Sequence, residues 1–362
     1  MKKLGFGCMR LPMIGEEVDY NEFSKMIKYY LDNGFNYFDT AHGYIRGLSE
    51  KAIKDCLTTK YDRNLYTLTN KLTESYFNSK EDIIPFFKSQ LDLCGVEYFD
   101  YYLMHAQNRE NYKKFKKCDA YQIALDLKEQ GYIKHVGISF HDTADILDMI
   151  LTENPFIEFV QIQFNYLDYD SDTIQSKKCY DVCIKHNKQI LIMEPVKGGK
   201  LVNLPDEGDK LVRNLNGGSN ASYAIRFAAS FKNVYMVLSG MSNMDQMIDN
   251  VSYMKEFKPL NDEEFETLAE VRNIIKGENL IECTACEYCL AGCPKKIQIP
   301  KLFAALNQHK RFKDWTLNSF YKFATVDSKA SDCIKCGKCE HICPQHLEIR
   351  KLLEEVAKTF EV

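Results

Sequence analysis

The sequence predicts an α/β protein in which a closed (β/α)8 TIM barrel precedes a small, mainly helical domain. Eight short runs rich in β-branched and aromatic residues alternate with stretches of helical periodicity up to about residue 256. Polar side chains gather near the carboxyl ends of these runs, where such a barrel has its active-site rim. A cysteine pattern then occurs twice, at an offset of fifty residues. We therefore expect a barrel at 1–260, a linker helix at 261–276 and a second domain at 277–362.

The expected strands are short, and many are apolar on both faces, as in a barrel that is filled inside and covered by helices outside. They span residues 4–9, 37–40, 65–70, 101–105, 135–139, 159–164, 189–193 and 234–238. Helices are expected at 20–31, 49–57, 80–93, 121–129, 173–185, 221–229, 244–254 and 262–275. A doubly wound open sheet is the alternative fold. The loops that should set substrate specificity are 106–119, 166–172 and 200–218.

Length and charge limit the class of protein. A chain of 362 residues exceeds most single cores, which fits one large and one small domain. The net charge is only −4, so we expect no nucleic-acid partner. No run approaches the roughly 20 apolar residues of a membrane span, and the start of the chain lacks a signal-peptide stretch. We expect a soluble, cytoplasmic protein with no membrane partner.

Eight of the fourteen cysteines form two copies of the pattern Cys-x2-Cys-x2-Cys-x3-Cys-Pro. Three thiolates on one tight loop can reach three iron corners of a cubane, while the fourth cysteine of such a run ligates the other cluster. The pattern therefore predicts two [4Fe-4S] clusters. Zinc usually takes two separated cysteine pairs, and disulfides need an oxidising compartment, so both alternatives fit poorly. The expected ligands are Cys283, Cys286, Cys289 and Cys343 for the first cluster, and Cys333, Cys336, Cys339 and Cys293 for the second.

The repeat continues beyond the cysteines, because Ile299 and Leu302 recur as Ile349 and Leu352. Each cysteine loop should therefore lead into a similar helix. A loose basic stretch between the motifs is either a docking patch for an acidic redox partner protein or a solvated helix face. Aromatic residues in the same region stand at spacings closer to helix than to strand, and they are Phe312, Trp315, Phe320, Tyr321 and Phe323.

Four residues with acid–base side chains lie at or just after the ends of three of these strands, namely Asp39, Tyr44, Lys71 and His105. A phenol has an unperturbed pKa of about 10, and a nearby cation favours its anion. Lys71 would supply that cation, and Asp39 is the carboxylate that would make its burial tolerable. Taken singly, each residue has an ordinary structural explanation. Together they could protonate a carbonyl oxygen.

The same stretches resemble the aldo-keto reductase superfamily. FDTAHGY (38–44), TNK (69–71), LMH (103–105), VGIS (136–139) and VQIQFN (160–165) occur in this order at strand ends. With the cysteine motifs added, the whole chain resembles the ferredoxin-containing branch of that superfamily. The resemblance implies that Tyr44 donates the proton and that His105 orients the substrate carbonyl.

The resemblance also implies a nicotinamide dinucleotide site. Ser139 and Gln161 would hold the nicotinamide carboxamide. Met193 stands where the family often has a tyrosine that stacks on the nicotinamide ring, and a methionine can also pack there. The pair Gly198 and Gly199 would form either a loop in which the backbone approaches the pyrophosphate or an ordinary loop.

The adenosine end of the nucleotide is less defined. Asn250 matches an adenine-contacting position of the family. NADP-dependent relatives carry basic side chains at the positions of Gly240 and Gln246, and a 2′-phosphate favours such side chains. The choice between NADP and NAD therefore stays open.

Together these features predict an NAD(P)-dependent oxidoreductase that interconverts a small carbonyl compound and its alcohol. The clusters would be structural or would exchange electrons with a redox partner protein, because a hydride carries two electrons and each cluster moves one. Two alternatives remain open. One is a redox enzyme in which a flavin or a reducible substrate accepts single electrons from the clusters. The other is a redox-sensing binding protein built on the same barrel.

Overall fold

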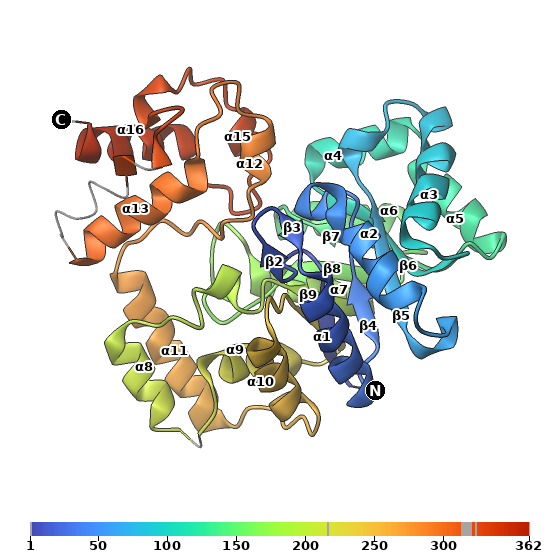
Figure 1. Cartoon of the computed structure of the whole chain (residues 1–362), viewed down its shortest axis with the longest axis horizontal. Helices are drawn as coiled ribbons and strands as arrows, with labels where there is room; N and C mark the ends of the chain where they lie inside the picture. Colours follow the sequence, from blue (N-terminus) through green and yellow to red (C-terminus); the bar gives the residue numbers. More distant parts are fainter. Residues whose placement is uncertain (1, 216, 313–320, 323, 362) are drawn as a thin grey trace. The chain divides into compact units, whose positions relative to one another are not determined.

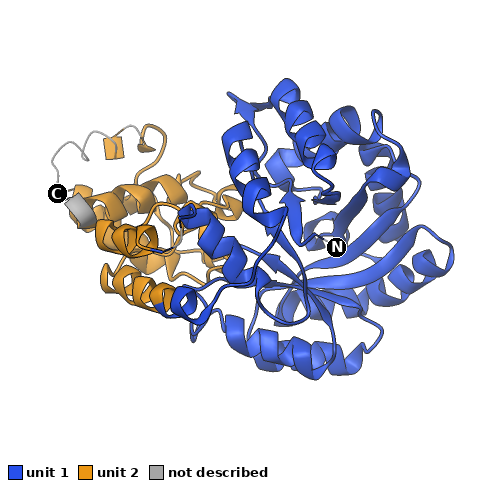
Figure 2. Cartoon of the chain, turned by 90° about the horizontal axis from the view of Figure 1, so that it is seen from below, with its two compact units in different colours: residues 1–196, 215–266 blue, residues 197–214, 267–362 orange. Residues whose placement is uncertain are grey.

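The computed structural model describes residues 2–215, 217–312, 321–322 and 324–361. The chain forms two compact units, which Figure 2 colours separately. The first comprises residues 1–196 and 215–266, and the second comprises residues 197–214 and 267–362. The segment 197–214 lies inside the range expected for the barrel domain, but it packs with the second unit.

Eight parallel strands close into a barrel in the first unit, which confirms the predicted fold and excludes the open sheet (Figure 1). The order around the barrel follows the chain, and β1 completes the closure by pairing with both β10 and β4. The strands are β1 (Leu4–Gly7), β4 (Tyr37–Asp39), β5 (Thr67–Leu72), β6 (Phe99–Gln107), β7 (Ile133–Phe140), β8 (Phe159–Gln163), β9 (Gln189–Met193) and β10 (Val234–Ser239). Each overlaps a run that the sequence predicts.

A cluster of large side chains fills the barrel. Its buried members are Tyr37, Tyr101, Leu103, Phe159, Leu191, Met236 and Leu238. Gly137 is required beside this cluster, because a Cβ there would lie 2.6 Å from both Leu103 Cδ2 and the Phe159 carbonyl oxygen. The cluster residues of β4, β6 and β8 precede the polar residues of the same strands. The polar residues are thereby left at the carboxyl ends.

Helices surround the strands, as the helical periodicities predict (Figure 1). They are α1 (Tyr20–Asp32), α2 (Leu48–Ile53) with a π-helical turn (Lys54–Thr58), α3 (Lys80–Cys94), α4 (Arg109–Lys117), α5 (Ala120–Glu129), α6 (Ala144–Glu153), α7 (Ser176–Lys185), α9 (Asn220–Ala229) and α10 (Met244–Met254). The helix α11 (Asp262–Gly277) follows, where the sequence predicts the linker helix.

Two features of the first unit differ from the sequence-based expectation. The expected loop 106–119 contains α4, whose Asn108 side chain caps the backbone amides of Glu110 and Asn111. This helix buries only Tyr112 and Phe115, so its charged sequence hides its periodicity. A short hairpin of β2 (Met13–Ile14) and β3 (Glu17–Val18) was also not expected.

The second unit repeats its helices at an offset of fifty residues. The short helix α12 (Tyr288–Ala291) corresponds to α15 (Lys338–His341), and α13 (Ile299–Phe312) corresponds to α16 (Ile349–Phe360). Each cysteine loop therefore leads into a similar helix, as predicted. The two long helices share one apolar core that includes Ile299, Leu302, Ile349, Leu353 and Val356.

The segment between the repeats is partly described. Tyr321 is buried and its ring stacks on Phe360, with ring centroids 4.7 Å apart. Phe312 ends α13, whereas Trp315, Phe320 and Phe323 lie outside the described residues. The helix α8 (Asp206–Arg213) occupies part of the expected loop 200–218. Its Gly208 lies against Val271, where a Cβ would come within 3.3 Å of that side chain.

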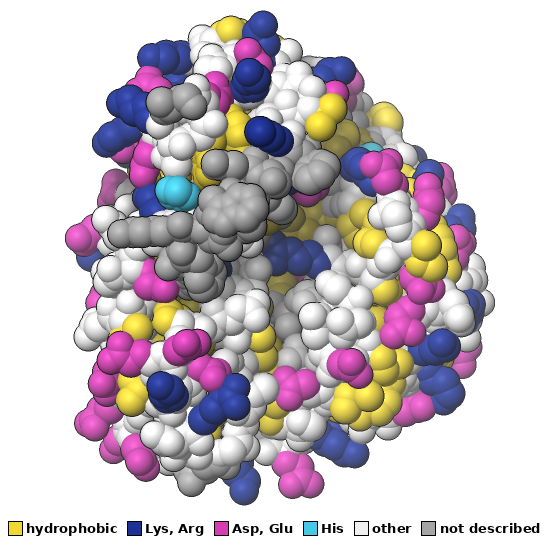
Figure 3. Space-filling model, turned by 60° about the vertical axis from the view of Figure 1, so that its left-hand side comes forward, with side chains coloured by type: hydrophobic (Ala, Val, Ile, Leu, Met, Phe, Trp, Pro, Cys, Tyr) yellow, Lys and Arg dark blue, Asp and Glu magenta, His cyan; other side chains and the backbone are white. Residues whose placement is uncertain are grey.

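The surface carries charges of both signs. On the face shown in Figure 3, Lys and Arg side chains are interspersed with Asp and Glu side chains. Within the described ranges, no helix is both long enough and apolar enough to cross a bilayer.

Candidate active site and metal centres

Three neighbouring strands and one turn bring the four predicted acid–base residues together. Asp39 ends β4, Lys71 lies near the end of β5, and His105 lies near the end of β6. The parallel register pairs Asp39 with Thr69 and Lys71 with Leu103, so the three side chains stand at one end of the barrel. All three are buried, and Lys71 is fully inaccessible.

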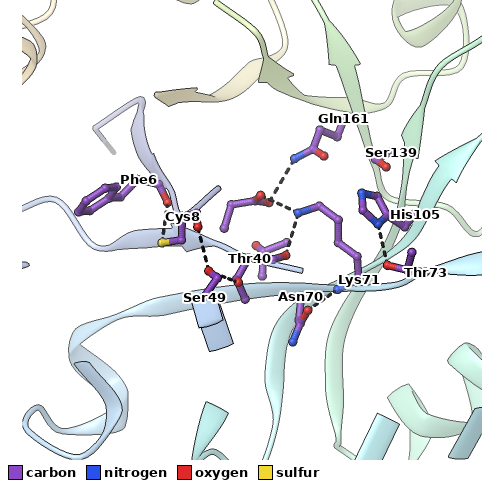
Figure 4. Close-up of polar contacts among 12 residues, drawn as sticks. Phe6, Cys8, Thr40, Ser49, Asn70, Lys71, Thr73, His105, Ser139 and Gln161 are labelled. Atoms are coloured by element: carbon purple, nitrogen blue, oxygen red, sulfur yellow. Dashed lines mark hydrogen bonds and ion pairs between the residues drawn. The ribbon is translucent and has the colours of Figure 1, made fainter. Parts of the chain in front are cut away.

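The Lys71 ammonium is held in a fixed position. Its Nζ lies 2.6 Å from Asp39 Oδ1 and donates to the Thr40 carbonyl oxygen at 2.8 Å (Figure 4). Gln161 Nε2 donates to the other oxygen of Asp39 at 3.2 Å. Burial lowers the pKa of Lys71 and Asp39 opposes that shift, so the pair is maintained by mutual attraction against the cost of desolvation.

Tyr44 lies beside this ammonium. The Lys71 Nζ is 4.8 Å from the centroid of the Tyr44 ring. Tyr44 starts a tight turn in which Ile45, Arg46 and Gly47 all have positive φ, at 50°, 55° and 86°. Such conformations are costly for side-chain-bearing residues and persist only where the surroundings impose them. The turn therefore directs the tyrosine back into the buried end of the barrel.

His105 completes the group. Its ring packs edge-on against the Tyr44 ring, with centroids 6.1 Å apart. Burial lowers the pKa of His105 well below its usual value, and the positive charge of Lys71 lowers it further. The imidazole is therefore neutral at physiological pH. Its Nδ1 lies 2.7 Å from Thr73 Oγ1 (Figure 4), and if that hydroxyl donates, the opposite nitrogen carries the proton.

A buried carboxylate behind the site has no obvious sequence signal. Glu50 accepts from Asn70 Nδ2 at 2.8 Å and from Gln90 Nε2 at 3.2 Å, and its second oxygen lies 2.6 Å from His42 Nδ1. These contacts join α2, α3 and β5 to the turn that leads to Tyr44. No spacing in the sequence connects Glu50 with Asn70 or Gln90.

The residues expected at the nicotinamide end are engaged with their neighbours. Ser139 and Gln161 pair in register on β7 and β8. Ser139 Oγ accepts from the Ala106 amide at 2.7 Å, and Ala106 has φ of 50°. Met193 ends β9 and is partly buried. These three residues stand on adjacent strands at the same end of the barrel as Asp39.

The residues expected at the adenosine end surround the loop after β10. Asn250 Nδ2 donates to Ser239 Oγ at 2.9 Å, and Gln246 Oε1 accepts from the Ser242 amide at 2.8 Å. Gly240 lies against Arg10, whose Cβ would be 3.4 Å from a Cβ at Gly240. Arg10 therefore supplies a basic residue next to position 240, where this chain has glycine.

The glycine pair expected at the pyrophosphate belongs to the second unit. Both Gly198 and Gly199 have positive φ, at 63° and 94°. A Cβ at Gly198 would lie 2.6 Å from the Thr284 carbonyl oxygen, so this glycine permits a close approach to the first cysteine loop. The nucleotide contacts inferred from the resemblance stay predictions.

Two cavities in the second unit gather the cysteines into the predicted sets. One is lined by Cys283, Cys286, Cys289 and Cys343, and the other by Cys293, Cys333, Cys336 and Cys339. In each, three cysteines come from one motif and the fourth from the other. Among the described residues, no three ligands converge on a single ion. A cubane does not require this, since each thiolate binds a different iron.

The cysteine loops reach this arrangement through left-handed turns. Ala285 and Glu287 have positive φ in the first loop, and Lys335 and Gly337 have it in the second. The Ala285 amide donates to Cys283 Sγ at 3.5 Å. Loops that curl around a cavity lined by four sulfur atoms have the donor set and the shape that an iron–sulfur cubane needs.

Comparisons with known families agree with this description. The sequence model described as "Aldo/keto reductase family" matches residues 3–273, and that of the "4Fe-4S dicluster domain" matches residues 282–347. The order of the two matches is that of the ferredoxin-containing branch, which the motifs resemble.

Two curated proteins are similar to part of the chain. The uncharacterized oxidoreductase YqkF of Bacillus subtilis (strain 168) is 24% identical over 212 residues, which cover 57% of this chain and 64% of the relative. The 9,11-endoperoxide prostaglandin H2 reductase of Trypanosoma cruzi (strain CL Brener) is 22% identical over 200 residues, which cover 53% and 64%. The chain thus spans 64% of the length of each of these relatives.

Solved structures share the barrel fold. The aldo-keto reductase AKR11C1 from Bacillus halodurans, in its holo form, matches with a TM-score of 0.61 and 24% identity, covering 74% of this chain and 91% of that one. An aldo-keto reductase from Klebsiella pneumoniae in complex with NADPH matches with a TM-score of 0.59 and 16% identity, covering 75% and 90%.

Proposed function

Because the chain belongs to the aldo/keto reductase family and carries a 4Fe-4S dicluster domain, we propose that it is an oxidoreductase that interconverts a small carbonyl compound and its alcohol with NADP or NAD. One observation carries the proposal. A buried ammonium, fixed by Asp39, lies 4.8 Å from the Tyr44 ring and next to a neutral His105.

The side chains act on the oxygen of the substrate. A nicotinamide bound at the rim supplies or accepts the hydride at the carbonyl carbon. Tyr44 holds the proton that the alkoxide oxygen takes up, and the Lys71 charge favours the phenolate that remains. His105 is neutral, so it donates a hydrogen bond to the carbonyl oxygen without competing for that proton.

We infer that the nucleotide is NADP and that Arg10 contributes to binding its 2′-phosphate. The support is the position of Arg10 against Gly240, where NADP-dependent relatives carry their own basic side chain. The Arg10 backbone is fixed there, because its carbonyl oxygen accepts from Ser242 Oγ at 3.0 Å. Arg10→Ala should lower kcat/KM for NADPH on the order of tenfold and leave that for NADH unchanged. Equal losses for both nucleotides would contradict this role.

We further propose that the two cysteine sets each hold a [4Fe-4S] cluster. The donor sets of the two cavities support this assignment. The clusters move single electrons and the barrel chemistry moves a hydride, so we assign them to exchange with a partner protein or to stabilising the second unit. Iron and sulfide analysis of anaerobically prepared protein tests this part separately.

The carbonyl chemistry is tested by steady-state kinetics without oxygen. Protein with reconstituted clusters should oxidise NADPH in the presence of an aldehyde or ketone from a broad panel. Tyr44→Phe removes the proton and should lower kcat roughly 10²- to 10⁴-fold with little change in nucleotide affinity. Tyr132→Phe, at a partly exposed tyrosine before β7, is the matched control. Unchanged turnover in Tyr44→Phe would refute the proposed role of the tetrad.

A further inference from the structure

The second unit contains a fully buried lysine that neither the carbonyl chemistry nor the cysteine pattern explains. Lys197 follows the barrel strand β9 in sequence, but it packs within the second unit. Its side chain is 0% exposed. Its Nζ donates to Gln345 Oε1 at 2.9 Å and lies 3.2 Å from Glu282 Oε2. Burying an ammonium is costly, so partners of this kind are required.

Both partners flank the first cysteine site. Glu282 directly precedes Cys283, and Gln345 lines the cavity two residues after Cys343. The residue after Lys197 also faces the site, because Gly198 lies against Thr284, which lines the same cavity. The ammonium is therefore held directly behind the wall of the first site, by residues from both cysteine motifs.

The charges around the first site do not cancel. The Glu282 side chain is 43% exposed, and Glu287, which lines the cavity, is also exposed, so water and salt screen both carboxylates. Lys197 is shielded from solvent, and its field is reduced far less. The net effect on the first cavity is that of a fixed positive charge.

The second site has cations of a different kind. Lys295 and Arg350 line its cavity, but Lys295 is exposed, and Arg350 is about half exposed and bonded to Glu340. Lys335, within the second motif, has a side chain that is 65% exposed and pairs with Glu354. Solvent therefore weakens every one of these charges.

We propose that Lys197 raises the reduction potential of the cluster in the first site above that of the cluster in the second. An added electron makes a cluster one unit more negative, and a buried cation stabilises that state. Net charge and hydrogen bonding are known determinants of cluster potentials. The inference rests on the cysteine sites holding clusters, as proposed above, and is independent of the tetrad. At equilibrium, a single electron from a donor would therefore reside on the first cluster.

The test is a potentiometric titration of the full chain, reconstituted without oxygen and followed by electron paramagnetic resonance. Lys197→Met removes the charge at similar size and should shift the potential of one cluster to more negative values. Lys197→Arg keeps the charge and should keep the potential. Lys335→Met is the matched control at the second site and should cause a smaller shift. A shift in Lys197→Met no larger than in Lys335→Met overturns the proposal.

Iron and sulfide analysis separates this outcome from a failure to bind clusters. Native protein without two clusters would refute the proposed metal centres themselves. If Lys197→Met does not assemble, Lys197→Gln retains a hydrogen-bonding group toward Gln345 and provides the same comparison. If that variant also fails, the native charge arrangement decides, because Cys293→Ser should leave only the first cluster and Cys343→Ser only the second. The potential of the first cluster should be the higher of the two, and an equal or lower value overturns the proposal.

Discussion

The two cysteine sites of the second unit share one sequence pattern, yet their surroundings differ. The first has partly exposed and buried cysteines and lies in front of a buried lysine. The second includes the exposed Cys336 and is also lined by Ile334, which is 58% exposed. The repeated cysteines thus determine which ligands line each site, whereas the residues between them and those outside the repeat determine charge and solvent access. Identical motifs do not imply equivalent clusters.

The largest effect should come from substituting the cysteine that each motif contributes to the site of the other motif. Cys343→Ser alters the second motif but should abolish the first cluster, because Cys343 lines the cavity with Cys283, Cys286 and Cys289. Cys293→Ser should abolish the second cluster instead. Electron paramagnetic resonance of each variant identifies the surviving cluster through its potential. Loss of the cluster in the same motif as the substitution would show that the ligands are not exchanged.

A smaller effect is expected from the glycines beside the sites. Gly198→Ala at the first site would be strained at φ 63° and would also place its Cβ 2.6 Å from a backbone oxygen. Gly337→Ala at the second site has φ 77° but no neighbour closer than 3.9 Å. We expect a cost of about 1 kcal/mol for the conformation at Gly337 and more than about 2 kcal/mol at Gly198. Denaturant unfolding, monitored by the absorbance of the clusters, measures the loss of stability in both variants. Equal losses would show that the structure around Thr284 relaxes to accommodate the added Cβ.

The smallest effect concerns reaction with oxygen. Cys336 is exposed and lines the second cavity, so the second cluster should be the first to be lost in air. The difference should appear as two phases of decay in visible absorbance, with the first-cluster resonance surviving the fast phase. A single phase with simultaneous loss of both resonances would mean that solvent access does not distinguish the sites.

Much of this could be predicted from sequence where the signal is local and periodic. The strand Gln189–Met193 and the helix Met244–Met254 have the predicted bounds, since an apolar run and a 3.6-residue period are encoded within each segment. The cysteine sets follow from the known exchange of ligands between such motifs. The close arrangement of Asp39 and Lys71 follows from the strand order of a barrel.

Contacts between distant segments left no such signal. One partner of Lys197 is Gln345, 148 residues later, and no pattern connects them. The glycines after Lys197 are compatible in sequence with a pyrophosphate loop or an ordinary loop, and neither interpretation predicts the close approach of Gly198 to Thr284. Thr73 was missed because a threonine at a strand end has many uses, and only the 2.7 Å distance to His105 identifies this one.

The exchanged fourth ligand also constrains the order of events during synthesis of the protein. Cys283, Cys286 and Cys289 of the first site are translated early. Their fourth partner, Cys343, is the last cysteine of the second motif and is translated after the other three cysteines of that motif. Until then, the thiols of the first loop face an open cavity. Iron and sulfide can therefore be enclosed there only once the chain has been made through both halves of the repeat.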